Sequence, residues 1–351
     1  MKRSTALWIA FAGAALVLVG CATVANVVSQ QALSTGPNGP ETPASLGVPF
    51  ERVSIPSHGR RLDGYLVRAP ADCRDPPAIL IYHGFDETIS FWVQAQEILW
   101  RHCVSSLVFD PSGSGDSTRP ASLMNLAEDA PSAYAFARGR FAAPVRLYVM
   151  GHSMGDAVML AAEPGLSPPP AGVIVADAFA SLKEFYALHG VSRILLAAMP
   201  DWWDNAKAVR QVHVPVLVVH SDADILTPLE QGRRLYAAAN PPKQIAVLHG
   251  FKHNGLRRDT SDDWWGPVLG FVGSPGVSHA PRLPAAGGPV PAPDLAAETA
   301  REEELRAGAV ALAPSSAPAA ASGPTALSPQ APPPAPDSLA LPPPASPSAA
   351  P

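Results

Sequence analysis

The chain has few cysteines, few charged residues and no cluster of basic side chains. Three cysteines in 351 residues are too few for the disulfide framework of a small secreted domain. Charged residues make up 16% of the chain and its net charge is -5, so it presents no basic field to a nucleic acid. The composition therefore argues against a cysteine-stapled fold and against nucleic acid as a partner.

An apolar run near the N-terminus is shorter than the about 20 residues that a membrane-spanning helix needs. It extends from Ala6 to Val19 behind a basic start, which is typical of an export signal. The run ends in Leu-Val-Gly-Cys, which resembles the lipobox of bacterial lipoproteins and implies that Cys21 is acylated and becomes the first residue of the mature protein. An ordinary signal peptide or an uncleaved anchor helix is the alternative. Ala22 after the cysteine carries no retention signal by the same resemblance, which favours the outer membrane of a two-membrane cell.

The composition divides the chain into four parts. Residues 1–20 form the predicted signal peptide, and residues 21–49, rich in small and turn-forming residues, form the lipid anchor site and a predicted flexible tether. Residues 273–351 are a Pro/Ala/Ser-rich tail with nearly half of the 41 prolines, and we expect it to be disordered because it cannot bury enough apolar surface. Residues 50–272 remain for one folded domain.

Eight short runs within this domain have the character of β-strands. Several are almost wholly apolar, which is typical of strands covered by helices on both faces. Helix-length stretches separate most of them, and this alternation predicts an α/β fold with a mostly parallel sheet, whose ligands bind at the carboxyl ends of the strands. The expected strands are Arg52 to Ile55, Leu62 to Arg68, Ala78 to His83, Ser105 to Asp110, Arg146 to Met150, Gly172 to Asp177, Val214 to His220 and Gln244 to His249.

A Gly-x-Ser-x-Gly pentapeptide occupies residues 151–155, directly after the fifth of these strands and before a helix-like run. A nucleophile elbow needs this strand–turn–helix setting, in which the glycines let the turn close around a strained serine. The N–H of Met154 at the helix start can face a developing oxyanion. Ser153 is therefore the candidate nucleophile, and a passive serine in a Gly-rich turn is the alternative.

A serine hydroxyl needs a base to take its proton and a third group to orient that base. Asp224 follows the strand VPVLVVH and His253 follows the strand QIAVLH, so both should lie at carboxyl ends of strands near Ser153. The sequence favours these two residues. The competing residues are Asp222 and Asp177 for the acid and His249, expected to lie still in its strand, for the base.

Five motifs in a fixed order resemble the α/β-hydrolase superfamily. They are HGF at 83–85, FDPSGSGDS at 109–117, GHSMG at 151–155, HSDADILTP at 220–228 and GFKHN at 250–254. The resemblance is nearest to the serine aminopeptidase S33-like or alpha/beta hydrolase domain 17-like branch, which contains esterases, thioesterases and lysophospholipases. It implies the α/β-hydrolase fold, with a mostly parallel eight-stranded sheet flanked by helices.

The resemblance also implies roles for single residues. Ser153, Asp224 and His253 would form the catalytic triad, and Phe85 would supply a second oxyanion N–H beside that of Met154. It implies no metal and no organic cofactor. The stretch from Phe179 to Val212 offers room for only a minimal lid, in which Trp202 and Trp203 could line an entrance or pack on the sheet.

Three positions depart from the pattern of this superfamily: Asp156 and Ser221 each replace a glycine, and PSGSG replaces a tyrosine-arginine-glycine pattern. A carboxylate at Asp156 is favourable at a helix start, but it would oppose an oxyanion if it pointed inward. Asp86 adds an acid near the mouth of the site, so we expect a preference for cationic or neutral substrates.

Two cysteines remain after the anchor cysteine, and an exported protein would sit where disulfides persist. Cys73 and Cys103 precede two strands that are neighbours in the order usual for these hydrolases, and neighbouring strands lie about 4.8 Å apart. A disulfide between them and two separate thiols both stay open, because the position of the loop at Cys73 does not follow from the sequence.

The sequence thus predicts a serine hydrolase that cleaves carboxylic esters or thioesters through an acyl-enzyme. Peptide-bond hydrolysis would use the same triad, and a third reading is a non-catalytic envelope lipoprotein on a hydrolase scaffold. The intact set of Ser153, Asp224 and His253 argues against a mere scaffold, which would need none of the three. The expected partners are a small-molecule or lipid ester and, through the lipid anchor, the periplasmic side of a bacterial membrane.

Overall fold

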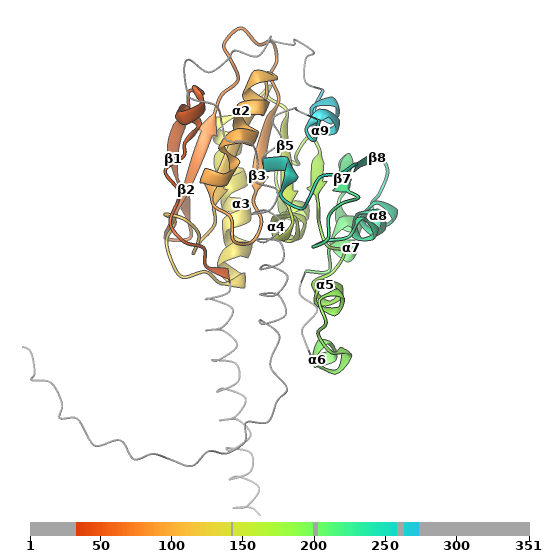
Figure 1. Ribbon diagram of the computed structural model, residues 1–351. Helices are drawn as coiled ribbons and strands as arrows, with labels where there is room; N and C mark the ends of the chain where they lie inside the picture. Colours follow the sequence, from red (N-terminus) through yellow and green to blue (C-terminus); the bar gives the residue numbers. More distant parts are fainter. Residues whose placement is uncertain (1–32, 142, 199–202, 258–262, 274–351) are drawn as a thin grey trace, which may run out of the picture. The chain divides into compact units, whose positions relative to one another are not determined.

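The computed structural model describes residues 33–141, 143–198, 203–257 and 263–273. An eight-stranded sheet runs through this part of the chain in the order β1-β2-β4-β3-β5-β6-β7-β8 (Figure 1). β2 pairs antiparallel with β1 and β4, and the other neighbouring strands are parallel. The strands are β1 Glu51–Ser57, β2 Arg60–Val67, β3 Ala78–Tyr82, β4 Ser105–Asp110, β5 Leu147–His152, β6 Val173–Ala176, β7 Val216–Ser221 and β8 Lys243–Leu248.

This sheet confirms the fold that the sequence predicts, strand for strand. The central strands β3 to β7 are buried along their whole length because helices cover both of their faces, which explains their unbroken apolar sequences. The edge strand β1 instead alternates between exposed and buried residues over most of its length. β8 ends at Leu248, so His249, expected within this strand, lies just beyond it.

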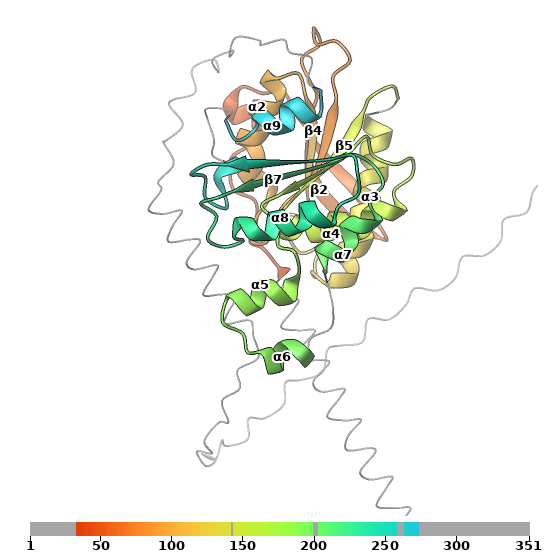
Figure 2. The ribbon, with the colours of Figure 1, turned by 90° about the vertical axis from the view of Figure 1, so that its right-hand side faces the viewer.

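The long helices form one layer on each face of the sheet. Figure 2 shows α2 and α9 on one side of the strands and α3, α4, α7 and α8 on the other. Each layer encloses its own apolar core, one around Ile98, Leu99 and Val268 and the other around Tyr134 and Leu160. The helices are α2 Val93–Arg101, α3 Leu123–Arg140, α4 Met154–Ala162, α5 Leu182–Leu188, α6 Arg193–Ala198, α7 Asn205–Ala208, α8 Leu229–Ala238 and α9 Gly266–Phe271.

Short 3-10 helices complete the connections between these elements. They are η1 Pro43–Leu46, η2 Ile89–Trp92, η3 Glu163–Gly165, η4 Val209–Gln211 and η5 Gly255–Arg257. Between β6 and β7, α7 packs against α4 and α8 in the helix layer on one face of the sheet, whereas α5 and α6 project beyond the sheet (Figure 1). In the described part of this stretch, these two short helices are what could serve as a lid, as the sequence analysis expected of a minimal lid. None of the helices in the described ranges is long and apolar enough to cross a membrane.

The structure corrects the predicted tether, because its described part, residues 33–49, lies against the domain. Thr35 and Val48 are buried, and η1 forms within the segment. Arg119 Nη2 donates to the carbonyl oxygen of Thr35 over 2.7 Å, and Asn38 Nδ2 donates to Asp63 over 3.2 Å. A Gly/Pro-rich composition hides such packing, since the partners come from remote parts of the chain. The proposed anchor Cys21 and the tail beyond Gly273 lie outside the described residues.

Cys73 and Cys103 form a disulfide at the amino-terminal edge of the sheet. Their Cα atoms are 5.7 Å apart, within the range that a disulfide needs. Cys73 lies in the loop before β3, and Cys103 is buried after the end of α2 and before β4. Since β3 and β4 are neighbours in the sheet, the bond ties the starts of two core strands together.

We expect the variant Cys73→Ala/Cys103→Ala to be about 2 to 4 kcal/mol less stable, because the bond limits the freedom of the unfolded chain between residues separated by 30 positions. Denaturant unfolding with and without dithiothreitol checks this. The reductant should lower the stability of the wild type and leave the double variant unchanged. The hydrolase activity that the sequence predicts should persist in folded protein, since the bond lies at the opposite edge of the sheet from Ser153. Equal stability of reduced and oxidised wild type would contradict the expectation.

Candidate active site

Ser153 stands on a sharp turn between β5 and α4. Its backbone angles, φ 53° and ψ -116°, are strained for a residue with a side chain, as a nucleophile elbow requires. The two glycines of the motif make the turn sterically allowed. A Cβ on Gly155 would lie 2.0 Å from the carbonyl oxygen of Tyr82, and one on Gly151 would lie 2.5 Å from the Cα atom of Asp156. The local sequence therefore presents the hydroxyl of Ser153 at the carboxyl edge of the sheet.

His253 lies between Ser153 and Asp224. Its Nε2 is 3.0 Å from the Oγ of Ser153, and its Nδ1 is 2.7 Å from Oδ2 of Asp224. The side chains of His253 and Asp224 are buried, whereas Ser153 is half-buried and lines a pocket. The structure thus brings together the candidate nucleophile, candidate base and candidate orienting acid that the sequence favours, at hydrogen-bond distances that would allow proton transfer.

The carboxylate of Asp224 is held by its own loop. Oδ1 accepts hydrogen bonds from the backbone N–H groups of Leu226 and Thr227 over 2.9 and 2.8 Å, and Oδ2 accepts one from the hydroxyl of Thr227 over 2.6 Å. Burial alone would raise the pKa of Asp224, but His253, followed by His220 and the hydroxyl of Thr227, reverses the shift and lowers it. Thr227 was missed in the sequence analysis, although it stands three residues after the acid in the same motif.

The environment of His253 makes its imidazole a strong base. Burial favours the neutral ring, but the carboxylate of Asp224 outweighs this effect and raises the pKa of His253 to about 9. Asp177 and Glu87 act in the same direction from further away. The neutral form that can take a proton from Ser153 is therefore populated increasingly as the pH rises toward this value.

The competing residues are occupied elsewhere. Asp222 accepts hydrogen bonds from His249 Nδ1 over 2.7 Å and from the N–H of Gly250 over 2.9 Å. The side chain of His249 is 82% exposed, so this pair lies at the surface. Asp177 accepts from the N–H of Ser221 over 3.0 Å. These three polar residues support neighbouring loops and do not hydrogen-bond to Ser153.

Both oxyanion candidates lie on the wall of the pocket that contains Ser153 and His253. Met154 is the first residue of α4, where helical N–H groups have no partner within the helix. Phe85 follows Gly84, whose own N–H donates to Oε2 of Glu87 over 2.9 Å and so fixes the loop after β3. The two residues approach the nucleophile from different elements, as an oxyanion hole requires.

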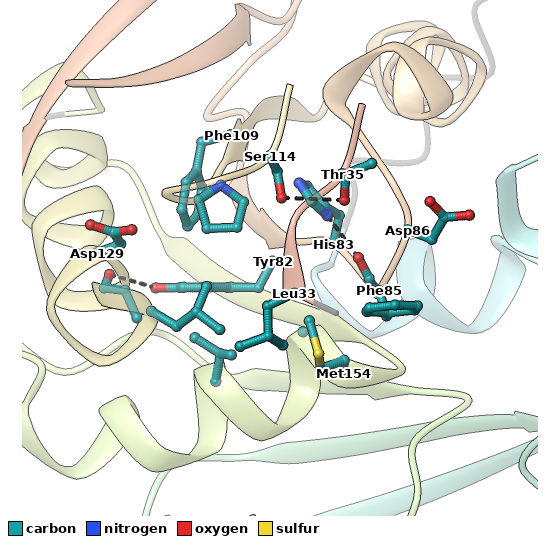
Figure 3. A pocket seen from close by; sticks show the side chains of 16 residues that line it. Leu33, Thr35, Tyr82, His83, Phe85, Asp86, Phe109, Ser114, Asp129 and Met154 are labelled. Carbon is teal, nitrogen blue, oxygen red and sulfur yellow. Dashed lines mark hydrogen bonds between the residues drawn. The ribbon is translucent and has the colours of Figure 1, made fainter. Parts of the chain in front are cut away.

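The pocket beside Ser153 is apolar and has a volume of about 130 Å³. Apolar cavities of about 150 Å³ bind a molecule the size of benzene, so a small ring or part of an acyl chain fits here. A second cavity of about 20 Å³ adjoins it, and Leu33, Phe85 and Met154 line both (Figure 3). Aromatic and aliphatic residues from the lid region supply most of the remaining wall: Phe179, Leu182, Phe185, Tyr186 and Trp203. Trp202 lies outside the described residues.

Asp156 is fully buried behind the elbow, where its Oδ2 accepts from the N–H of Ala176 over 3.3 Å. Burial raises the pKa of Asp156 well above its ordinary value and so favours the neutral form, which would not oppose an oxyanion. Asp86 lines the smaller cavity in a backbone conformation with φ 55° (Figure 3), and the preference for cationic or neutral substrates stays a prediction.

Within the described ranges, Asp177, His220 and Asp224 form a group whose possible ligand atoms lie within 4.8 Å of one another. Asp224 is hydrogen-bonded to His253, and Nε2 of His220 bonds to the carbonyl oxygen of Thr227 over 2.6 Å. Burial lowers the pKa of His220 and so favours its neutral ring. These contacts explain why Asp177 and His220 converge on Asp224: both bind the loop that carries this acid.

Comparison with known proteins finds relatives of this chain by sequence. No protein-family model matches the chain. The uncharacterized protein Rv2307c of Mycobacterium tuberculosis is 30% identical over 259 residues, which cover 72% of this chain and 90% of the relative. The lysophosphatidylserine lipase ABHD12 of Danio rerio is 28% identical over 188 residues. That match covers 48% of this chain and 49% of the lipase, so this chain spans about half of the lipase's length.

Solved structures of two esterases share the fold. The esterase Pf2001 of Pyrococcus furiosus has a TM-score of 0.55 with 16% sequence identity, covering 68% of this chain and 96% of the esterase. Est1E of Butyrivibrio proteoclasticus, with ferulic acid bound, has a TM-score of 0.50 with 19% identity and covers 63% of this chain and 96% of its own. At such low identity these likenesses establish a common architecture and nothing about the substrate.

Proposed function

We propose that this chain cleaves carboxylic esters or thioesters through an acyl-enzyme. The premise is that the chain belongs to the α/β-hydrolase superfamily and to the same family as the uncharacterized protein Rv2307c. One observation carries the proposal: His253 lies within hydrogen-bond distance of both Ser153 and Asp224 beside an apolar pocket. The similarity to a lysophosphatidylserine lipase supports an ester substrate. We also propose that the chain belongs to the S33-like or domain 17-like branch of the superfamily, which its sequence motifs favour.

The first half-reaction forms the acyl-enzyme. The Oγ of Ser153 attacks the carbonyl carbon while its proton passes to Nε2 of His253, and the carbonyl oxygen becomes an oxyanion. The backbone N–H groups of Met154 and Phe85 stabilise this oxyanion. As the tetrahedral intermediate collapses, His253 gives the proton to the leaving alcohol or thiol, and the acyl group stays on Ser153.

The second half-reaction releases the acid. Neutral His253 takes a proton from a water molecule, whose oxygen attacks the acyl carbon and forms a second oxyanion in the same place. The proton then returns from His253 to the Oγ of Ser153 as the acyl bond breaks. Asp224 remains ionised throughout, because it stabilises the imidazolium that forms in each half and holds the ring by its Nδ1.

A fluorophosphonate probe tests the mechanism directly. We expect it to label wild-type protein and to leave Ser153→Ala unlabelled, because only an activated serine hydroxyl reacts. Turnover of p-nitrophenyl esters, a thioester and aminoacyl p-nitroanilides then separates an esterase from a peptidase, and we expect the oxygen and thiol esters to be the better substrates. Labelling that persists in Ser153→Ala would overturn Ser153 as the nucleophile, and no labelling of wild type would overturn the proposal and favour a non-catalytic lipoprotein.

We further propose that the protein is anchored in the bacterial cell envelope by acylation of Cys21, with the domain on the periplasmic side. The support is the lipobox-like sequence behind a short apolar run. We expect wild-type protein to partition with membranes and to incorporate labelled palmitate, and Cys21→Ser to do neither. Cys21 recovered unmodified in soluble wild-type protein would contradict this proposal without affecting the proposed chemistry.

A further inference from the structure

A buried glutamate, Glu87, lies at the junction of the loops that form the candidate site. It is 3% exposed and stands two residues after Phe85, between β3 and η2. Its Oε2 accepts hydrogen bonds from the N–H of Gly84 and from the indole Nε1–H of Trp92, both over 2.9 Å. One carboxylate oxygen thus fixes the loop that carries the second oxyanion candidate.

The other oxygen of Glu87 faces the elbow and the histidine loop. Oε1 lies 3.0 Å from Nδ1 of His152 and 3.4 Å from Nε of Arg257. His152 precedes the nucleophile, and its Nε2 bonds to the backbone carbonyl oxygen of His253 over 3.0 Å. Arg257 follows His253 in η5. Glu87 is therefore linked to the segment that carries His253 in two ways, through His152 and through Arg257.

The close packing around Glu87 leaves little freedom for these loops. A Cβ on Gly84 would lie 3.1 Å from Oε1 of Glu87 and 3.2 Å from Nδ1 of His152, so any larger residue here would press on both side chains. The rings of His152 and His253 lie 5.0 Å apart. A small displacement of the carboxylate would be transmitted to the loop after β3, to the elbow and to the ring of His253.

Glu87 also places a negative charge close to the reaction. Burial alone would raise its pKa, but Arg257 and His152 outweigh burial and hold the pKa well below its ordinary value. The ionisable groups that act on or respond to His253 are Asp224, Asp177 and Glu87, together with His152 and His220. Glu87 differs from Asp224 in this set because it touches neither Ser153 nor the ring nitrogens of His253 in any hydrogen bond of the described residues.

We propose that Glu87 is a positioning residue of this site, which holds the loop after β3, the elbow and the histidine loop in their positions relative to one another. Its negative charge also stabilises the protonated form of His253. The inference rests on the proposed serine-hydrolase function. It assigns Glu87 an indirect action on catalysis, through Gly84 and His152, and no contact with the reacting atoms.

The test compares Glu87→Gln with Glu97→Gln, a matched change on α2. Glu97 is also a buried glutamate with an arginine partner, since its Oε1 lies 2.6 Å from Nε of Arg101, but it lies outside the candidate site. We expect Glu87→Gln to lower kcat and the rate of fluorophosphonate labelling about 10- to 100-fold while KM changes less than about 2-fold, because misplacement of catalytic groups acts on the chemical step. Glu97→Gln should leave both rates unchanged.

The pH profile of labelling distinguishes positioning from plain structural support. We expect the acid limb to move to lower pH in Glu87→Gln, since removal of a nearby negative charge lowers the pKa of His253, and to stay in place in Glu87→Asp, which keeps the charge. If Glu87→Gln does not fold, Glu87→Asp still tests the proposal. Its acid limb should lie at the same pH as that of wild type, and its labelling rate should be lower, because the shorter side chain cannot reach Gly84 and His152 together.

The outcomes separate this inference from the proposed function. Wild-type protein that the probe does not label would refute the hydrolase mechanism itself. Labelled wild type with an equal rate and an equal pH limb in Glu87→Gln would overturn the role of Glu87 alone, and so would a loss of rate no larger than that of Glu97→Gln. If Glu87→Asp folds and is as active as wild type, the inference that Glu87 positions the loops is wrong.

Discussion

Ser153→Ala and His253→Ala are each expected to lower kcat for ester hydrolysis by about four to six orders of magnitude, and the double variant should be no slower than either single variant. The reason is that nucleophile and base act as one unit: without His253 the hydroxyl of Ser153 is a weak nucleophile, and without Ser153 the imidazole has nothing to activate. Steady-state turnover of an activated ester by the three purified variants measures this. Losses that add up in the double variant would contradict a shared mechanism.

Two control variants keep this experiment specific. Ser132→Ala removes a hydroxyl on α3 that donates only to the backbone carbonyl of Glu128 over 2.8 Å, and it should turn over like wild type. His249→Ala removes the competing histidine, which is paired with Asp222 at the surface, and it should also stay active. A loss in His249→Ala as large as that in His253→Ala would mean that the base is assigned to the wrong residue.

The parts of the fold that were predicted correctly depend on local patterns. All eight strands follow from short runs of strand-forming residues, several of them almost wholly apolar, and β4 has the very bounds expected, Ser105–Asp110. The elbow follows from five consecutive residues, because a tight strand-to-helix turn needs its glycines at fixed positions. Such features can be recognised before any long-range contact is known.

The parts that could not be predicted depend on contacts between remote segments. Thr35 is buried where Arg119 and Gly113, far along the chain, bind its backbone. The composition of a Gly/Pro-rich stretch does not predict such contacts. Glu87 reads in the sequence as one more acid in a loop, since its partners Trp92, His152 and Arg257 come from three other places.

Asp224→Asn is expected to lower kcat at neutral pH by about four orders of magnitude while the protein keeps its fold. An asparagine preserves the shape of the side chain but not its charge, so it neither stabilises the imidazolium nor holds His253 in the tautomer that presents Nε2 to Ser153. The loss of charge should also lower the pKa of His253, which Asp224 raises from its ordinary 6.5 to about 9. What little activity remains should therefore show its acid limb at lower pH than that of wild type.

The same pair makes a prediction about stability, with a definite sign. His253 has a raised pKa in the folded protein, so its contribution is complete below pH 6.5 and is lost as the pH rises through about 9. Asp224 has a lowered pKa, so its contribution is present above its ordinary pKa of 3.8 and is lost as the pH falls through the lowered value. Urea unfolding of wild type and Asp224→Asn across this range checks both limbs. The stability gap between them should be widest at about pH 4 to 6.5 and narrow toward pH 9. A gap that is constant with pH, or one that widens on the alkaline side, would contradict the ion pair between Asp224 and His253 and with it the assignment of Asp224 as the orienting acid.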